Sequence, residues 1–149
     1  MSTVFQKLDL EDHEEIVVVG APVSFEPELE GLAGVTVVRD PREVRVITFA
    51  LAFVTRCDQV GRLTAETATR ARADAIVWFA YPKKTSKKYT RDLSRDRGWE
   101  PLGAAGYEGV RQVAIDEDWT ALRFRRVELI RSLRQAPSRA LTGRGKGRA

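Results

Sequence analysis

The sequence predicts a three-layer α/β domain whose mostly parallel sheet ends in an antiparallel hairpin. The apolar runs that begin at Ile16 are continuous stretches of Val and Ile rather than alternating patterns, which is typical of strands covered on both faces. Helical patterns lie between several of these runs, as a parallel sheet requires. Two β-rich runs flank residues 116–118, which favours a hairpin at the end of the sheet. Together these observations indicate a Rossmann-like fold.

Six strands are predicted from runs rich in β-branched and aromatic residues. Pro82 ends the fourth strand, because a proline nitrogen cannot donate a hydrogen bond to a neighbouring strand. In chain order, the predicted strands lie at residues 16–20, 35–40, 44–53, 75–82, 110–115 and 119–124.

Three crossovers are predicted to contain helices. In the first, Ser24 is a suitable N-cap, Pro27 lies in the first turn and Gly31 can end the helix, so this helix is short. The second is a longer amphipathic helix with apolar or small residues every three or four positions. Its apolar face consists of Val54, Cys57, Val60, Leu63, Thr67 and Ala71. The third, at residues 90–106, is broken by glycines and prolines, which predicts one or two short helices.

The chain has 149 residues, which corresponds to about one domain with its own core. The net charge of +4 is unevenly distributed, with an acidic front half and a basic end. We divide the chain into an acidic N-terminal segment (1–15), one Rossmann-like domain (16–126) and a basic, partly disordered tail (127–149). The N-terminus does not have the pattern of a secretory signal, and no apolar run is long enough to span a membrane. With Cys57 as the single cysteine, we expect a cytoplasmic protein without membrane contact.

A basic loop follows directly on the fourth strand. Lys83, Lys84, Lys87 and Lys88 come after Pro82 in close succession. In an open parallel sheet, ligands bind outside the carboxyl ends of the strands. A right-handed crossover makes the fifth strand parallel to the fourth, so the acidic turn at 116–118 should emerge at the same edge.

The leading hypothesis is a non-enzymatic protein that binds an anion at this edge of the sheet. The predicted site consists of Lys83, Lys84, Ser86, Lys87 and Asp116. The anion would belong to a phosphate-bearing small molecule or to a protein partner. A structural alternative stays open, in which the lysines screen the acidic turn and otherwise lie in water. We expect no cofactor.

Several segments of the chain form a recognisable combination. The aromatic strand ends in Tyr81-Pro82-Lys83-Lys84, Asp92-Leu93 and AIDEDWTALR (114–123) follow, and Ala21-Pro22 and Phe25 come after the first strand. In these segments the chain resembles, over residues 16–126, a family of small bacterial proteins known only as a domain of unknown function. The resemblance implies a layout similar to a trimmed class I methyltransferase sheet, and it implies no activity.

A divergent S-adenosylmethionine-dependent methyltransferase is the main alternative function. Such a cofactor needs a close backbone approach at a glycine-rich turn after the first strand, where this chain has Gly20-Ala21-Pro22-Val23-Ser24. Asp40 follows the second strand, where an acidic residue would hold ribose hydroxyls. An Asp-Pro turn explains Asp40 equally well. An enzyme of this kind would use Asp40 and the edge loops.

A third hypothesis is a nucleic-acid accessory protein that contacts phosphates through its basic tail, residues 137–149. A passive solubilising tail is the simpler interpretation. Tyr81, Tyr89 and Trp99 are predicted to be exposed near the basic loop, where they could stack on bases. Trp78 and Trp119 are predicted to lie in the core.

Other chemistries find little support in the sequence. Metal catalysis needs clustered ligands, whereas the chain has one His and one Cys, and adjacent carboxylates in a tight turn rarely converge on one ion. His13 is expected at the surface. Cys57 is expected to pack in the core, although Arg56 and the helix start would favour its thiolate. We therefore predict no catalytic residue and no metal site.

Overall fold

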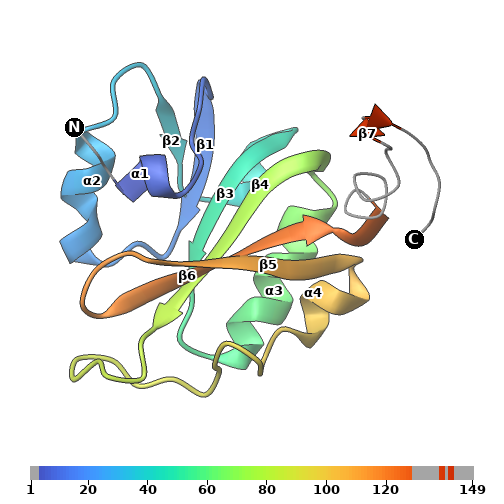
Figure 1. Ribbon diagram of the computed structural model, residues 1–149. Helices are drawn as coiled ribbons and strands as arrows, with labels where there is room; N and C mark the ends of the chain where they lie inside the picture. Colours follow the sequence, from blue (N-terminus) through green and yellow to red (C-terminus); the bar gives the residue numbers. More distant parts are fainter. Residues whose placement is uncertain (1–3, 129–137, 140, 143–149) are drawn as a thin grey trace.

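The structure, a computed structural model, describes residues 4–128, 138–139 and 141–142. Within these residues a six-stranded sheet carries helices on both faces (Figure 1). The predicted disorder of the basic tail and its proposed contact with nucleic acid fall mainly on residues outside the described part. No described helix is both long and apolar enough to cross a membrane.

The elements of the sheet have the following bounds. The strands are β1 (Glu15–Val19), β2 (Thr36–Val38), β3 (Ile47–Phe53), β4 (Ala71–Pro82), β5 (Tyr107–Ala114) and β6 (Trp119–Arg126). The helices are α1 (Val4–Lys7), α2 (Glu26–Glu30), α3 (Cys57–Ala68) and α4 (Glu100–Ala104), with two 3-10 turns, η1 (Val23–Phe25) and η2 (Pro41–Glu43). A separate short pair consists of β7 (Ser138–Arg139) and β8 (Leu141–Thr142).

The strand order is β2-β1-β3-β4-β6-β5. The first four strands of this order are parallel, and β6 is antiparallel to both of its neighbours, so β5 runs parallel to β4. This confirms the predicted parallel sheet with an antiparallel hairpin at its end. The direction of winding reverses between β1 and β3, because β2 lies on one side of β1 and the later strands lie on the other.

The core has two halves because both faces of the central strands are buried. On one face, α3 and α4 cover side chains that include Val77 and Phe79. On the other face, α1, η1 and α2 cover the alternate positions, such as Leu51 and Trp78. Figure 1 shows these two helix layers on opposite sides of the sheet. The continuous apolar strands of the sequence therefore correspond to strands packed on both faces.

The N-terminal segment contributes to this core, although we expected residues 1–15 to lie outside the domain. Val4, Phe5 and Leu8 are buried, and Leu8 is fully inaccessible. The indole nitrogen of Trp78 donates a hydrogen bond of 2.8 Å to the carbonyl oxygen of Leu8. Asp9 forms an ion pair of 2.7 Å with Arg123 of β6. The acidic composition of the segment concealed an apolar spacing that fits one helix face.

The boundary between α3 and β4 also differs from the prediction. The helix ends at Ala68, and β4 already begins at Ala71, four residues before the predicted start at 75. Ala71 is buried as predicted, but it pairs with Ile47 in the sheet instead of extending the helix face. A small residue is compatible with either element, so its burial alone could not distinguish them.

We expect Leu8→Ala to lower the free energy of unfolding by about 2–5 kcal/mol, because it leaves a cavity beneath Trp78. Val46→Ala is the matched control, since Val46 is 52% exposed, and its effect should stay within about 0.5 kcal/mol. Urea denaturation measures both values. Equal effects of the two substitutions would show that the N-terminal segment is not part of the cooperative core.

Candidate functional site

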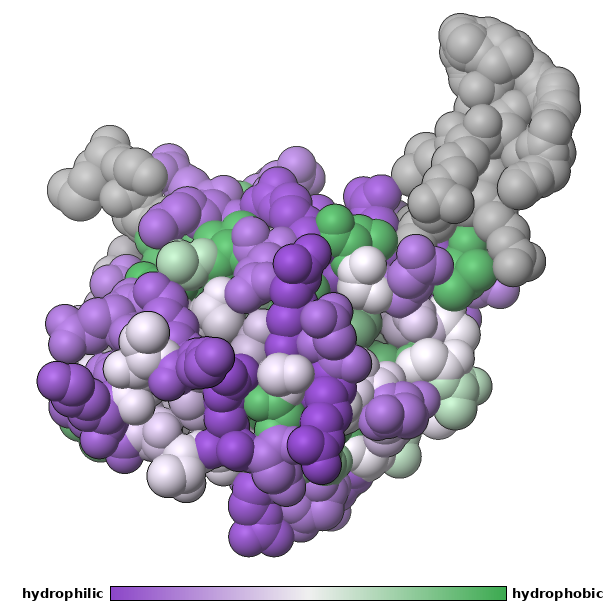
Figure 2. All heavy atoms as spheres, turned by 60° about the horizontal axis from the view of Figure 1, so that its bottom comes forward, coloured by the Kyte–Doolittle hydropathy of each residue, from purple (hydrophilic) through white to green (hydrophobic). Residues whose placement is uncertain are grey.

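The basic loop and the acidic turn meet at one edge of the sheet, as the sequence predicted. Pro82 at the end of β4 pairs with Trp119 at the start of β6. The backbone amide of Lys83 then donates a 2.7 Å hydrogen bond to the carbonyl oxygen of Asp118. The loop after β4 forms the lower rim of Figure 1, and Figure 2 turns this edge forward to show that hydrophilic residues cover most of it.

Two of the predicted site residues make structural contacts at this edge. The hydroxyl of Ser86 donates to a carboxylate oxygen of Asp118 at 2.9 Å and accepts from the amides of Lys88 and Tyr89. One carboxylate oxygen of Asp116 accepts from the amides of Asp118 and Trp119 at 2.8 and 2.9 Å. Ser86 therefore anchors the basic loop, and Asp116 caps its own turn.

The predicted lysines separate into two groups. Lys83 and Lys84 line an open hollow of about 670 Å³, whereas Lys87 is exposed and lies outside this lining. Across the described residues, the ammonium groups of these three lysines take part in no ion pair. The structure thus does not support the idea that they neutralise the acidic turn by direct pairing.

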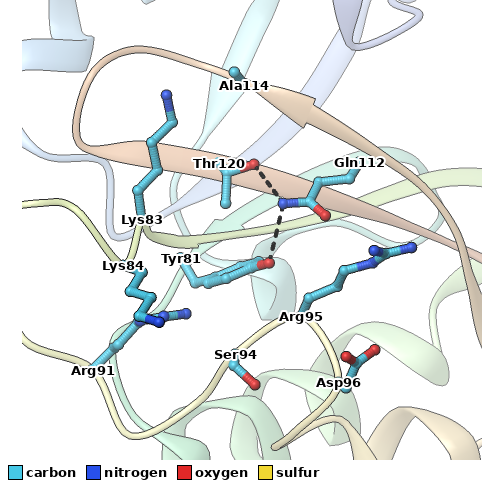
Figure 3. A pocket seen from close by; sticks show the side chains of 10 residues that line it. All are labelled: Tyr81, Lys83, Lys84, Arg91, Ser94, Arg95, Asp96, Gln112, Ala114 and Thr120. Atoms are coloured by element: carbon cyan, nitrogen blue, oxygen red, sulfur yellow. Dashed lines mark hydrogen bonds between the residues drawn. The ribbon is translucent and has the colours of Figure 1, made fainter.

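We call this hollow the cationic trough. It lies on the α3 face of the sheet, beside the loop that connects β4 to α4 (Figure 3). Its lining residues are Tyr81, Lys83, Lys84, Arg91, Ser94, Arg95, Asp96, Gln112, Ala114 and Thr120. Four cations and one carboxylate make it strongly basic. Sequence reasoning did not assign Arg91 and Arg95 to a site, although both follow the lysines along the chain.

A hydrogen-bond network forms the floor of the cationic trough. The amide nitrogen of Gln112 donates to the hydroxyls of Tyr81 and Thr120, at 3.3 and 3.1 Å. The hydroxyl of Thr120 in turn donates to the carbonyl oxygen of Val113. Tyr81 is only 2% exposed, which corrects the prediction that its ring is accessible near the loop. Burial raises the pKa of its phenol above the ordinary value, so it stays a neutral hydrogen-bond donor.

The cationic trough exists because the third crossover has little helix. The α4 helix has five residues and packs against α3 and the start of β5. Beyond it, Val110 and Gln112 of β5 stay exposed. A second hollow of about 340 Å³ shares Arg95, Asp96 and Gln112 with the trough and extends it across β5 and β6.

A second candidate site lies where the strand order reverses. A pocket of about 590 Å³, here the switch-point pocket, opens at the carboxyl ends of β1 and β3, which is the usual ligand position in open α/β sheets. It is lined by Gly20, Pro22, Val23, Ser24, Phe53, Thr55, Gln59, Lys88, Tyr89 and Trp119. It shares no lining residue with the cationic trough.

Backbone donors around the switch-point pocket already have acceptors. The side-chain oxygen of Gln59 accepts from the amides of Thr55 and Arg56, at 2.7 and 3.0 Å. The carboxylate of Asp92 accepts from the amide of Cys57 at 2.7 Å. The N-terminus of α3 is therefore closed by side chains and offers no free cradle for a phosphate.

The turn after β1 serves contact between strands. Gly20 has a positive φ of 71°, and a Cβ atom there would lie 2.9 Å from the carbonyl oxygen of Phe53. Packing between the ends of β1 and β3 therefore requires this glycine. The positive φ and the close approach of Phe53 thus explain the glycine at position 20 without a bound ligand.

Trp119 has an unpartnered donor in the wall of the switch-point pocket. Its side chain is 3% exposed, and the indole nitrogen has no hydrogen-bond acceptor among the described residues. Its ring contacts those of Phe53 and Tyr89, with centroids 5.1 and 4.8 Å away. The burial of Trp78 and Trp119 confirms the predicted core positions. A buried donor without an acceptor is destabilising.

Asp40 is engaged in its own turn. Its carboxylate accepts from the backbone amide and the guanidinium of Arg42, with contacts of 2.8–3.1 Å. The Arg42 hydrogen bonds lower the pKa of Asp40 to about 2. Asp40 caps η2 and is not part of the switch-point lining. This geometry supports the Asp-Pro turn that the sequence also allowed.

Neither Cys57 nor His13 forms part of a reactive cluster. Burial raises the pKa of the Cys57 thiol, and the hydrogen bond and negative charge of Asp92 raise it further. The neighbouring Arg56 therefore does not produce a thiolate. His13 accepts a hydrogen bond from the amide of Glu11 and rests edge-on against Phe49. Among the described residues, no group of three or more His, Cys, Asp or Glu side chains could hold a metal ion.

Solved structures identify the fold. No protein-family model matches the chain, and no curated protein matches it in sequence. A SAM-dependent methyltransferase from Aquifex aeolicus superposes with a TM-score of 0.52 at 16% identity, over 81% of this chain and 86% of that chain. The fold is Rossmann-like and similar to that of this methyltransferase. The mitomycin 7-O-methyltransferase MmcR superposes with a TM-score of 0.56 at 13% identity, over 81% of this chain and 52% of that chain. An S-adenosylmethionine-dependent methyltransferase from Clostridium acetobutylicum superposes with a TM-score of 0.50 at 6% identity, over 82% of this chain and 88% of that chain.

The methyltransferase fold confirms the layout that the resemblance in the sequence implied. At these low identities, the likeness concerns the fold and not the activity. The resemblance to a bacterial family of unknown function stays a prediction, since no family model matches.

We expect Ser86→Ala to release the basic loop, because three hydrogen bonds depend on this hydroxyl. Amide hydrogen exchange at Lys88 and Tyr89 should accelerate, and unfolding should require about 1 kcal/mol less. Thr85→Ala, at an exposed neighbouring position, is the control. Unchanged exchange at both amides would mean that the loop is held by other contacts.

Asp40 should make stability depend on pH in acid. Its folded-state pKa of about 2 lies below the ordinary value of 3.8, so its contribution is complete above about pH 4 and is lost as the pH falls toward 2. The difference in urea midpoint between the parent chain and Asp40→Asn should shrink through this window, and 1 M salt should reduce it because the pair is exposed. A constant difference down to about pH 2 would contradict the Asp40–Arg42 pairing.

Proposed function

We propose that this chain is a divergent methyltransferase that binds S-adenosylmethionine, or a closely related adenosine compound, in the switch-point pocket. The observation that carries the proposal is a pocket at the reversal of strand order, lined by Trp119, whose buried indole nitrogen has no acceptor among the described residues. The similar folds of proteins described as S-adenosylmethionine-dependent methyltransferases support this choice of ligand.

The pocket lining fits an adenosine group. Phe53, Tyr89 and Trp119 provide aromatic surfaces for a flat base, and the volume lies within the usual range for small-molecule sites. The Trp119 indole N–H would donate to a ring or ribose acceptor, and the hydroxyl of Ser24 would serve a ribose hydroxyl. When bound, S-adenosylmethionine supplies an activated methyl group. Asp40 is not needed in this arrangement, because Arg42 already holds its carboxylate.

Calorimetric titration with S-adenosylmethionine and S-adenosylhomocysteine tests this proposal. Trp119→Phe should weaken binding about 2–13-fold, which corresponds to one neutral hydrogen bond. Trp78→Phe is the matched control: it removes a comparable indole from the core outside the pocket and should keep the parent affinity. Near-ultraviolet circular dichroism verifies that both variants fold. Absence of heat at millimolar ligand with the folded parent chain would reject the proposal.

A second candidate is the non-enzymatic binding of an anionic ligand or partner at Lys83, Lys84, Ser86, Lys87 and Asp116. It is supported by Lys83 and Lys84, which line the trough with Arg91 and Arg95 and have no ion pair in the described part of the chain. The engaged side chains of Ser86 and Asp116 favour the lysines over these two as ligand contacts. Either function would be exercised in the cytoplasm, which the single Cys57 supports.

A further inference from the structure

We propose that the cationic trough binds a phosphate ester of a small hydroxylated molecule, such as a sugar phosphate or a nucleotide. The phosphate is held by Lys84 and Arg91 with help from Lys83, and the hydroxylated part lies over the floor formed by Tyr81 and Gln112. This inference rests on the second of the proposed functions, because it requires anion binding at this edge. It moves the site away from Ser86, Lys87 and Asp116.

The phosphate end is defined by converging cations. Lys83, Lys84 and Arg91 all line the trough, and in the view of Figure 3 Lys84 and Arg91 are drawn at the same end of it. Arg91 is held near the floor by its contact with Tyr81, with the guanidinium 5.9 Å from the ring centroid. Within the described residues none of these cations has a carboxylate partner. Three neighbouring cations suit a dianion with several acceptor oxygens better than a single carboxylate.

The floor favours a polar, uncharged group next to that phosphate. The hydroxyl of Tyr81 accepts from Gln112 and keeps its own proton free to donate. The side-chain nitrogen of Gln112 is shared between Tyr81 and Thr120, which directs the amide oxygen elsewhere. The floor thus offers both a donor and an acceptor. Ligand hydroxyls can use both, whereas an apolar group would leave them unsatisfied.

The far end of the cationic trough matches the same ligand class. Arg95 and Asp96 lie opposite the Lys84–Arg91 end in Figure 3. The carboxylate of Asp96 can accept from ligand hydroxyls, and Arg95 can hold a second anionic group. The hollow of about 670 Å³ has room for a molecule of nucleotide size. Inorganic phosphate would occupy only the Lys84–Arg91 end.

Titration calorimetry with three probes tests the proposal: ribose 5-phosphate, inorganic phosphate and ribose. Ribose 5-phosphate should bind most tightly, inorganic phosphate more weakly, and ribose not measurably. The double variant Lys84→Ala/Arg91→Ala should lose at least about 10-fold in affinity for both phosphates, because each charged hydrogen bond contributes strongly. Arg97→Ala removes an exposed charge of the same crossover outside the lining and should bind like the parent chain.

A floor variant separates the two parts of the site. Gln112→Leu should lower the affinity for ribose 5-phosphate and leave the affinity for inorganic phosphate unchanged. Equal binding of the two phosphates, unaffected by Gln112→Leu, would overturn the role of the floor. An equal loss in Arg97→Ala and in the double variant would overturn the location. If neither phosphate binds the parent chain at millimolar concentration, the anion-binding function itself fails, and the switch-point proposal is not affected.

Discussion

The pairing of β4 with β6 determines where every candidate site lies. Because β6 runs antiparallel between β4 and β5, Pro82 faces Trp119, and the amide of Lys83 reaches Asp118. This register directs one aromatic residue, Trp119, toward the switch-point pocket. It directs the next residue, Thr120, toward the floor of the cationic trough. Two hollows with different chemistry are thus built from adjacent residues that point to opposite faces of one strand.

The shortness of the third crossover has the next largest effect. A longer helix there would cover β5 and β6, and their outward positions would then have to be apolar. Gln112 and Thr120 are instead polar and hydrogen-bonded to each other, so this part of the sheet tolerates water. The methyltransferase-like sheet therefore retains its parallel core while one flank carries an open hollow. The same crossover carries the arginines that give the trough its charge.

Hydrogen bonds to nearby backbone amides explain why several polar residues that the sequence suggested as ligand contacts are occupied within their own turns. Ser86, Asp116 and Asp40 all looked like ligand contacts in the sequence, yet each satisfies nearby backbone amides. Short polar side chains at turns commonly do this, and sequence position alone does not distinguish capping from binding. Lys84 lines the cationic trough and Lys87 does not. Ser86, which lies between them, is hydrogen-bonded to Asp118 of a distant segment.

The parallel strands, the terminal hairpin and the meeting of the basic loop with the acidic turn were all predictable from the amino-acid sequence. They follow from continuous apolar runs and from the handedness of crossovers, which are local or general constraints. Three other features became evident only in the folded protein: residues 4–10 join the core, Tyr81 is buried, and Arg91 and Arg95 complete the trough. These features depend on contacts between segments far apart in the chain. The spacing of residues within one segment carries no information about which distant neighbour will cover it.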